Sequence, residues 1–288
     1  MLLPCPECNY RCSQSAKACP SCGHPFKEGE LRAPGLVRVK LLTILALAVL
    51  LGAIVMLVMG LIQFQPYSVP PESTGGFSGR VMALEFVQTP SQANVILGDA
   101  TSPNRAAMRN QIYVDFVWIV CYLALFLLVA NFLRRRRCPW AYYLSWLATI
   151  VALGAAAFDV KENLGMLQLV YLPEFAQRVI SDWQIRDAAI VKWTLSFVTM
   201  ALLSLFFFGL DHRLNRIGFF FALTALAGFI GLWYKPLLGL LVPAPLLIGT
   251  ALLAYTAWRF PEPFLREEHP MWEKLTFWSS GRKFFPWT

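Results

Sequence analysis

The sequence predicts an all-α polytopic membrane protein with about six transmembrane helices and a small N-terminal module built on four cysteines. Three observations predict this fold class. Of the 288 residues 57% are hydrophobic and 15% are charged, the apolar residues come in long uninterrupted blocks, and two Cys-Pro-x-Cys pairs stand near the start. Since ordinary globular chains carry about a quarter charged residues, this charge content and these blocks exclude an ordinary soluble domain.

Six apolar blocks are long enough to cross a membrane. Each is near the roughly 20 residues that span about 30 Å of hydrocarbon as a helix. The blocks are 41–62, 112–133, 140–158, 193–210, 217–234 and 236–258. Only Lys235 separates the last two, and Pro236 opens the second, so we expect a hairpin between them.

The basic residues predict the orientation of these spans, because cytoplasmic loops carry an excess of Lys and Arg. Most of the 25 basic residues, including the four arginines at 134–137, fall on the side of the N-terminus if six spans are drawn. We therefore expect a multi-pass protein of the cell inner membrane with both termini cytosolic. The net charge of +8 is explained by this topology, and the lipid bilayer is one expected partner.

The predicted organisation has four parts. They are a cysteine module over 1–27, a linker over 28–40, a transmembrane domain over 41–260, and a cytosolic interfacial tail over 261–288. The outside segments are about 64–111 and 159–192. Within the first of them, Thr89-Pro90-Ser91-Gln92 has a capping-box pattern that predicts a helix start, Gly98 predicts its end, and Ser102-Pro103 begins a helix that runs into the second span.

The cysteine spacing predicts a metal site. Cys5 and Cys8 form one C-x2-C pair, and Cys19 and Cys22 form the other. Each pair spans one tight turn, and two such pairs close a tetrahedral shell of four thiolates, the geometry that Zn2+ prefers in structural sites. Placement in a reducing cytosol also favours metal binding over disulfides. Redox chemistry or another metal are the alternatives.

The segment over about 3–27 resembles the short zinc-ribbon modules found at the ends of many bacterial proteins. All four ligand positions are present. Cys12 stands where those modules have a hydrophobic residue and is a competing ligand by its C-x3-C spacing, whereas we expect His24 to be a solvated turn residue rather than the alternate ligand it could also be. The resemblance implies structural zinc, and our leading hypothesis is that the module docks a cytosolic protein. Because the module is only mildly basic and has no aromatic platform, we do not expect it to bind nucleic acid.

A second group of polar residues lies at the outer ends of the predicted spans. Asp115 begins the second span, Asp159, Glu162 and Asn163 follow the third, and Lys192 precedes the fourth. Spacings of three and four place Asp159, Glu162 and Asn163 on one helical face. Placing an ionisable group at this depth costs free energy unless the group is paired or hydrated. Such groups are therefore candidates for a functional role.

Two interpretations of this group remain open. One is a structural clasp in which Lys192 pairs with Asp115 or Asp159. The other is an outward-facing pocket in which a carboxylate acts as a general base, a proton carrier or a hard-cation ligand. The three histidines, His24, His212 and His269, all fall on the cytosolic side, and the sequence has no P-loop, nucleophile elbow or His-Glu-x-x-His pattern.

The run over roughly 80–210 resembles a group of uncharacterised bacterial membrane proteins with a D-F-x-x-I-x-x-Y element and a later D-x-x-E-N element. Asp115, Phe116, Ile119 and Tyr122 fit the first element, and Asp159, Glu162 and Asn163 fit the second. The resemblance implies no activity. Two functional hypotheses therefore follow from the sequence: a membrane anchor whose zinc ribbon docks a partner, and a membrane enzyme or transporter for a lipid or small solute.

Overall fold

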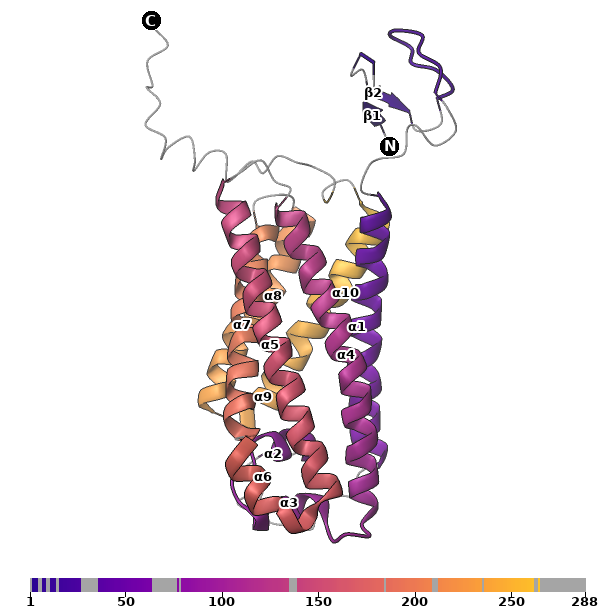
Figure 1. Ribbon diagram of the computed structural model, residues 1–288. Coiled ribbons are helices and arrows are strands. Elements are labelled where there is room, and N and C mark those ends of the chain that lie inside the picture. Colours follow the sequence, from indigo (N-terminus) through magenta and orange to yellow (C-terminus); the bar gives the residue numbers. More distant parts are fainter. Residues whose placement is uncertain are drawn as a thin grey trace, which may run out of the picture.

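A computed structural model describes residues 2–4, 7–8, 11–13, 16–26, 36–63, 77, 79–134, 139–183, 185–208, 212–234, 236–261 and 264. Five long helices run side by side (Figure 1). They are α1 (Leu36–Gln63), α4 (Pro103–Arg134), α5 (Pro139–Tyr171), α7 (Ile185–Phe207) and α8 (His212–Trp233). All five lie in stretches long and apolar enough to cross a membrane. The all-α polytopic prediction is confirmed; the expected tail lies almost wholly outside the described residues.

The sixth apolar block is not one continuous helix. It forms α9 (Pro236–Leu241) and α10 (Pro243–Arg259), which meet at Val242. Proline lacks a backbone N–H and its ring clashes with the preceding turn, so Pro243 at the start of α10 ends the α9 helix. The single span expected over 236–258 is thereby corrected to two helices with a break inside the apolar segment.

The long helices close into a ring. Each packs against its neighbours in the order α1, α4, α5, α7, α8 and α10, and α10 packs against α1 again. The outer side of this ring is apolar, as α1 illustrates with Ile44 61% exposed and Leu51 62% exposed. Large exposed apolar surfaces are rare on soluble monomers, so this surface fits contact with lipid chains.

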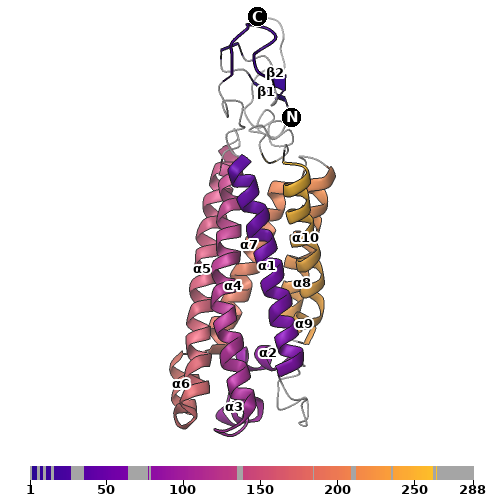
Figure 2. The same cartoon turned by 90° about the vertical axis from the view of Figure 1, so that its right-hand side faces the viewer.

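Short helices gather at one end of the ring, opposite the start of α1 (Figures 1 and 2). They are α2 (Arg80–Glu85), α3 (Pro90–Leu97), the 3-10 helix η2 (Pro173–Phe175) and α6 (Ala176–Trp183). We call this the α2 end of the bundle. The small helix α2 contacts both α5 and α7, so it sits at the mouth of the ring.

The caps predicted for α3 are present. The Thr89 hydroxyl accepts a hydrogen bond from the Gln92 backbone N–H at 3.2 Å, and the Gln92 side chain accepts one from the Gln88 N–H at 2.9 Å. Gly98 ends α3 with a φ of 77°, a conformation that favours glycine. Pro103 then begins α4, as the sequence predicts.

Arg105 fixes the α2 end to the long helices. Its buried guanidinium donates to the carbonyls of Gly98 and Asp99 in the turn before α4, and to those of Leu169 and Val170 near the end of α5. One side chain thus joins three chain segments, which holds the mouth of the ring in place.

The N-terminal segment contains two short strands. Strand β1 (Leu2–Pro4) pairs antiparallel with β2 (Arg11–Ser13), with Leu3 opposite Cys12. A further bridge joins Ala18 to Pro25 across the second cysteine turn. The pairing brings the first cysteine turn and β2 together in a segment too short to build a large core.

Candidate functional site

Lys192 is the centre of a buried charged cluster at the α2 end. Its Nζ lies 2.9 Å from Oε2 and 3.1 Å from Oε1 of Glu162, 3.2 Å from Oδ1 of Asp159 and 3.4 Å from Oε1 of Glu85. We define the Lys192 cluster as this lysine with Glu85, Asp115, Asp159, Glu162 and Asn163. It joins α2, α4, α5 and α7.

The helix α5 supplies half of the cluster from one face. Asp159 is 4% exposed, and Glu162 and Asn163 are fully buried, whereas Lys161 between them is half-buried. The spacing of three and four residues predicted this common face. The helix α5 continues beyond the apolar block 140–158 to Tyr171, and it carries these residues in its second half.

Neighbouring polar groups complete the cluster. The Tyr122 hydroxyl donates to Oδ2 of Asp159 at 2.8 Å. The Asn163 amide donates to Oδ2 of Asp115 at 2.7 Å. Thus Asp115 is held by Asn163 and not by an ion pair with Lys192, while Asp159 is shared between the lysine and the tyrosine. All five polar residues singled out in the sequence lie together; their roles remain predictions.

Sequence reasoning missed Glu85 and Trp193. Glu85 is 6% exposed at the end of α2, where it contacts Lys192 and accepts a hydrogen bond from the Trp193 indole N–H at 2.8 Å. Nothing in the residues around Glu85 pointed to Lys192, because Glu85 lies in the first outside segment, 30 residues before Asp115. Trp193 follows Lys192 directly, so an aromatic residue beside a membrane lysine was the available hint.

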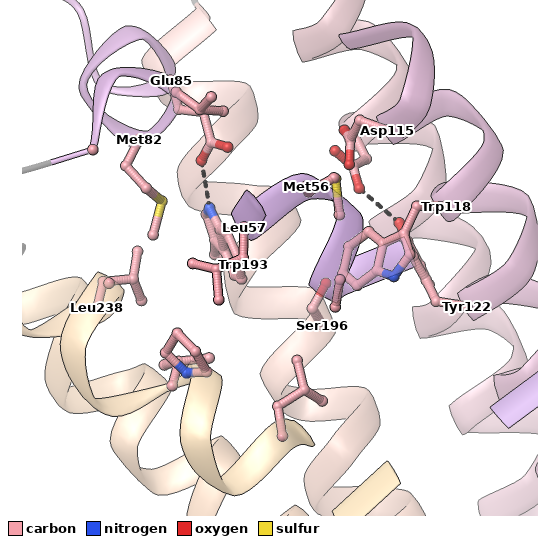
Figure 3. A pocket seen from close by; sticks show the side chains of 18 of the residues that line it. Met56, Leu57, Met82, Glu85, Asp115, Trp118, Tyr122, Trp193, Ser196 and Leu238 are labelled. Atoms are coloured by element: carbon pink, nitrogen blue, oxygen red, sulfur yellow. Dashed lines mark hydrogen bonds between the residues drawn. The ribbon is translucent and has the colours of Figure 1, made fainter. Parts of the chain in front are cut away.

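A cavity of about 710 Å³ lies inside the ring. All six ring helices contribute to its wall, together with α2 and α9. Glu85 and Trp193 face it from one side, and Asp115, Trp118 and Tyr122 from another (Figure 3). Its volume is in the range of cavities that hold drug-sized ligands, which are mostly apolar with a few placed polar groups.

The cavity distinguishes the members of the cluster. Glu85, Asp115, Asp159, Asn163 and Lys192 line it, whereas Glu162 does not. The ion pairs of Lys192 with Glu162, Asp159 and Glu85 have the geometry of the clasp, and Asp159 and Glu85 also line the cavity, as does Asp115, which makes no such pair. The two interpretations describe overlapping parts of one site.

The break between α9 and α10 lies in the same cavity wall. Leu238 and Gly239 of α9, Val242 at the break, and Pro243 and Leu246 of α10 all line the cavity. Interrupted helices at membrane depth are tolerated where they are buried in protein or line a cavity. In transporters such helices commonly form the binding site.

The cysteine segment contains a second candidate site. The sulfur atoms of Cys8, Cys19 and Cys22 lie within 4.8 Å of one another, and those of Cys8 and Cys19 are 3.5 Å apart. Thiolates about 2.3 Å from a tetrahedral zinc would be separated by about 3.8 Å. The donor set therefore fits a metal ion. Cys5, the expected fourth ligand, lies outside the described residues.

Hydrogen bonds favour the thiolate form of Cys19. Burial raises the pKa of its thiol, but hydrogen bonds to the backbone of Cys22 and Ser21 and to the side chains of Cys12 and Cys8 lower the pKa to about 6. The thiolate, the form that binds metal, is then favoured at neutral pH. His24 provides its backbone carbonyl to the Cys19 N–H, and its side chain does not belong to the sulfur group.

No protein-family model, curated protein or solved structure matches the chain. The class of protein is thus defined by the fold and the two sites alone: a helical, multi-pass membrane protein with a cysteine cluster able to hold a metal ion.

Proposed function

We propose that this is a small-molecule-binding membrane protein of the transporter type, which takes an amphiphilic molecule or small solute into the cavity inside its helical ring. The observation that carries the proposal is the cavity of about 710 Å³ with the Lys192 cluster in its wall. A structural clasp alone needs no such space, because protein interiors are close-packed.

The helix break in the opposite wall supports transport over simple storage. Val242 keeps helical dihedral angles and its N–H bonds to the Leu238 carbonyl, but Pro243 has no N–H to donate, so the helical hydrogen bonding is interrupted there. Residues on both sides of this interruption line the cavity. Movement of one short helix such as α9 requires fewer contacts to be lost than movement of a long one. Gly239 of α9 lines the cavity, and nothing lies within 4 Å of the position of a Cβ there, so this short helix has open space beside it.

The test uses three probes that differ only in their polar group: 4-phenylbutylamine, 4-phenylbutan-1-ol and 4-phenylbutanoate. The full chain is purified in detergent, and its melting temperature and native mass spectrum are recorded with each probe. Because a ligand that binds only the folded state raises the apparent stability, we expect a saturable rise and a one-to-one adduct with at least one probe.

Two variants of one helix provide the control. Leu246→Trp adds bulk in the cavity wall, whereas Ile248→Trp adds it at a position that is 44% exposed on the same helix. The proposal expects loss of binding in the first and retention in the second. Absence of saturable binding by all three probes, or equal binding by both variants, would contradict it.

A second proposal concerns the cysteine cluster. We propose that it holds a structural Zn2+ through Cys5, Cys8, Cys19 and Cys22 as a zinc ribbon, and that this ribbon docks a cytosolic protein. The close approach of three sulfurs supports the metal. Deleting residues 1–27 and comparing the proteins crosslinked to the full and shortened chains tests docking, and an unchanged set of crosslinked proteins would refute it.

The proposed orientation places the α2 end outside the cell and both termini in the cytosol of a bacterial inner-membrane protein. Arg38 and Lys40 of α1, Arg134 of α4, Arg213 of α8 and Arg259 of α10 all belong to the opposite end of the helices. The positive-inside rule assigns that end to the cytosol. The cavity mouth at α2 then faces outward.

A further inference from the structure

We infer that the cavity selects a protonated amine: a ligand with one ammonium group that donates hydrogen bonds and an apolar or aromatic body. The inference rests on the proposed function and adds the chemical class of its ligand. It depends on the charge of the cavity wall, on acceptor atoms that have no partner, and on the aromatic side chains beside them.

Carboxyl groups outnumber cations at the site. Three carboxyl groups line the cavity, those of Glu85, Asp115 and Asp159, and among the described residues two cationic side chains, Lys192 and Arg80, line it as well. The Arg80 guanidinium also donates to the carbonyl of Ile96, at the end of α3. An excess of buried carboxylates favours an added positive charge, because unpaired charge in a low dielectric is costly.

Asn163 and Gln111 line the cavity, and each has a covered amide oxygen that lacks a hydrogen-bond partner among the described residues. These oxygens are Oδ1 of Asn163, a side chain with no exposure, and Oε1 of Gln111, a side chain 8% exposed. Their orientation is fixed, because the Asn163 amide nitrogen donates to Asp115 and the Gln111 nitrogen donates to the carbonyl of Met56 at 3.3 Å. A buried acceptor without a donor is costly, and a small outward shift of either side chain would present its oxygen to a donating ligand in the cavity.

Aromatic rings border the same space. Trp118 is held by its indole N–H, which donates to the Val49 carbonyl at 3.0 Å, and its ring packs edge-on against Tyr122 with centroids 5.0 Å apart. The Lys192 Nζ lies 5.0 Å from the centroid of Trp193. Rings beside a cationic group stabilise it through their negative faces, and the apolar wall around Met56 and Leu238 suits a hydrocarbon body.

The geometry favours an ammonium over a metal ion. Among the described residues, the set that brings three donor atoms within 4.8 Å of one another is Cys8, Cys19 and Cys22, and the carboxylates of the cluster form no such set. A hard cation such as Ca2+ takes six to eight oxygens at about 2.3–2.6 Å. The spread of the carboxylates is better matched by the longer N–H···O contacts of an ammonium.

The affinities of the probe series at pH 7 test this inference. Dissociation constants of 4-phenylbutylamine and 4-phenylbutan-1-ol are measured by calorimetry on the full chain in a neutral detergent. We expect the amine to bind at least tenfold more tightly than the alcohol, and 4-phenylbutanoate to give no detectable heat. The trimethylammonium analogue, which has charge but no N–H, should bind more weakly than the primary amine because Asn163 and Gln111 then stay unpaired.

Variants assign the preference to the cavity. Asp115→Asn should lower the affinity for the amine toward that of the alcohol and leave the alcohol unchanged, whereas the exposed Glu174→Gln should change neither. If the alcohol binds as tightly as the amine and both are lost in Leu246→Trp, the inference fails while the proposed function stands. If no probe binds, both fail. Even if Asp115→Asn does not fold, the affinities of the amine and the alcohol for the wild-type protein still test the inference.

Discussion

The ammonium of Lys192 contacts both carboxylate oxygens of Glu162, at 2.9 and 3.1 Å, and the glutamate side chain has no solvent exposure. This pair connects α7 to α5 at the depth where α2 enters the ring. Glu162 does not line the cavity, whereas Lys192 does. The pair therefore positions the lysine, which also contacts Asp159 and Glu85 in the cavity wall.

Lys192→Met should destabilise the protein strongly. Removing one partner of a buried charge pair typically costs about 3–5 kcal/mol, because the other charges stay buried without compensation. The free energy of unfolding in detergent, from a denaturant titration, checks this. Lys161→Met on the neighbouring face of α5 is the control and should change stability by less than about 0.5 kcal/mol. Equal stability of the two variants would contradict the assignment.

Adding Glu162→Gln to Lys192→Met should recover part of that loss. The double variant removes both charges of the closest pair, so fewer uncompensated carboxylates remain in the interior. A double-mutant cycle on the same unfolding measurement should give an interaction free energy of about 0.5–3 kcal/mol, the range found for residues in contact. Strict additivity would mean that the two side chains do not interact.

Tyr122→Phe should cost about 1.5–3 kcal/mol. The change removes the hydroxyl that donates to Asp159 at 2.8 Å and leaves that carboxylate oxygen without its donor. Thermal unfolding of the variant reports the effect. Tyr255→Phe, at a site 53% exposed, keeps its ring contact and should be neutral. A Tyr122→Phe protein as stable as this control would show that Asp159 does not depend on the hydroxyl.

Two glycines on either side of the α8–α9 turn should respond in opposite ways. A Cβ on Gly231 would come within 2.7 Å of the Leu238 backbone, so Gly231→Ala should destabilise by about 1–3 kcal/mol. Gly239→Ala meets nothing within 4 Å and should be neutral or slightly stabilising. Melting temperatures of the two variants, compared in one detergent, provide the test; the reverse order would rule out the close approach of α8 and α9.

Zinc content should depend on Cys5 rather than on Cys12. Cys12 is 1% exposed and hydrogen-bonded to Cys19, and we expect it to pack in the fold of the segment rather than to bind the metal. Elemental analysis of purified protein should find about one zinc per chain in wild type and in Cys12→Ser, and a much lower content in Cys5→Ser and Cys19→Ser. Zinc lost in Cys12→Ser and kept in Cys5→Ser would reassign the fourth ligand.

The parts of the site that depend on the spacing of nearby residues were predictable from the sequence. Asp159, Glu162 and Asn163 share a helical face because of their spacing, and the C-x2-C pairs bring Cys19 and Cys22 together within one turn. Pro243 was also a local signal for the helix break, but the long apolar block around it led to the expectation of a single span. Each of these features is decided within a few residues of the chain.

The rest depends on packing between distant segments. Glu85 reaches Lys192 only because the six-residue helix α2 folds into the mouth of the ring, and nothing in its local sequence indicates this. The choice of Glu162 as the closest partner of Lys192 depends on the rotation of α5 against α7. The cavity itself follows from the closure of the ring by α10 against α1, which hydropathy does not report.

The most direct test of the central claim is the reactivity of a cysteine placed in the cavity wall. Ser196→Cys faces the cavity from α7, whereas Ser204→Cys lies on the same helix, 3% exposed and outside the cavity lining. Both proteins are treated with a small methanethiosulfonate reagent, with and without 4-phenylbutylamine, and the modified residue is found by peptide mass spectrometry. We predict that Cys at 196 is labelled and is protected by the amine, and that Cys at 204 is not labelled. Equal inertness at both positions would contradict a ligand cavity inside this ring.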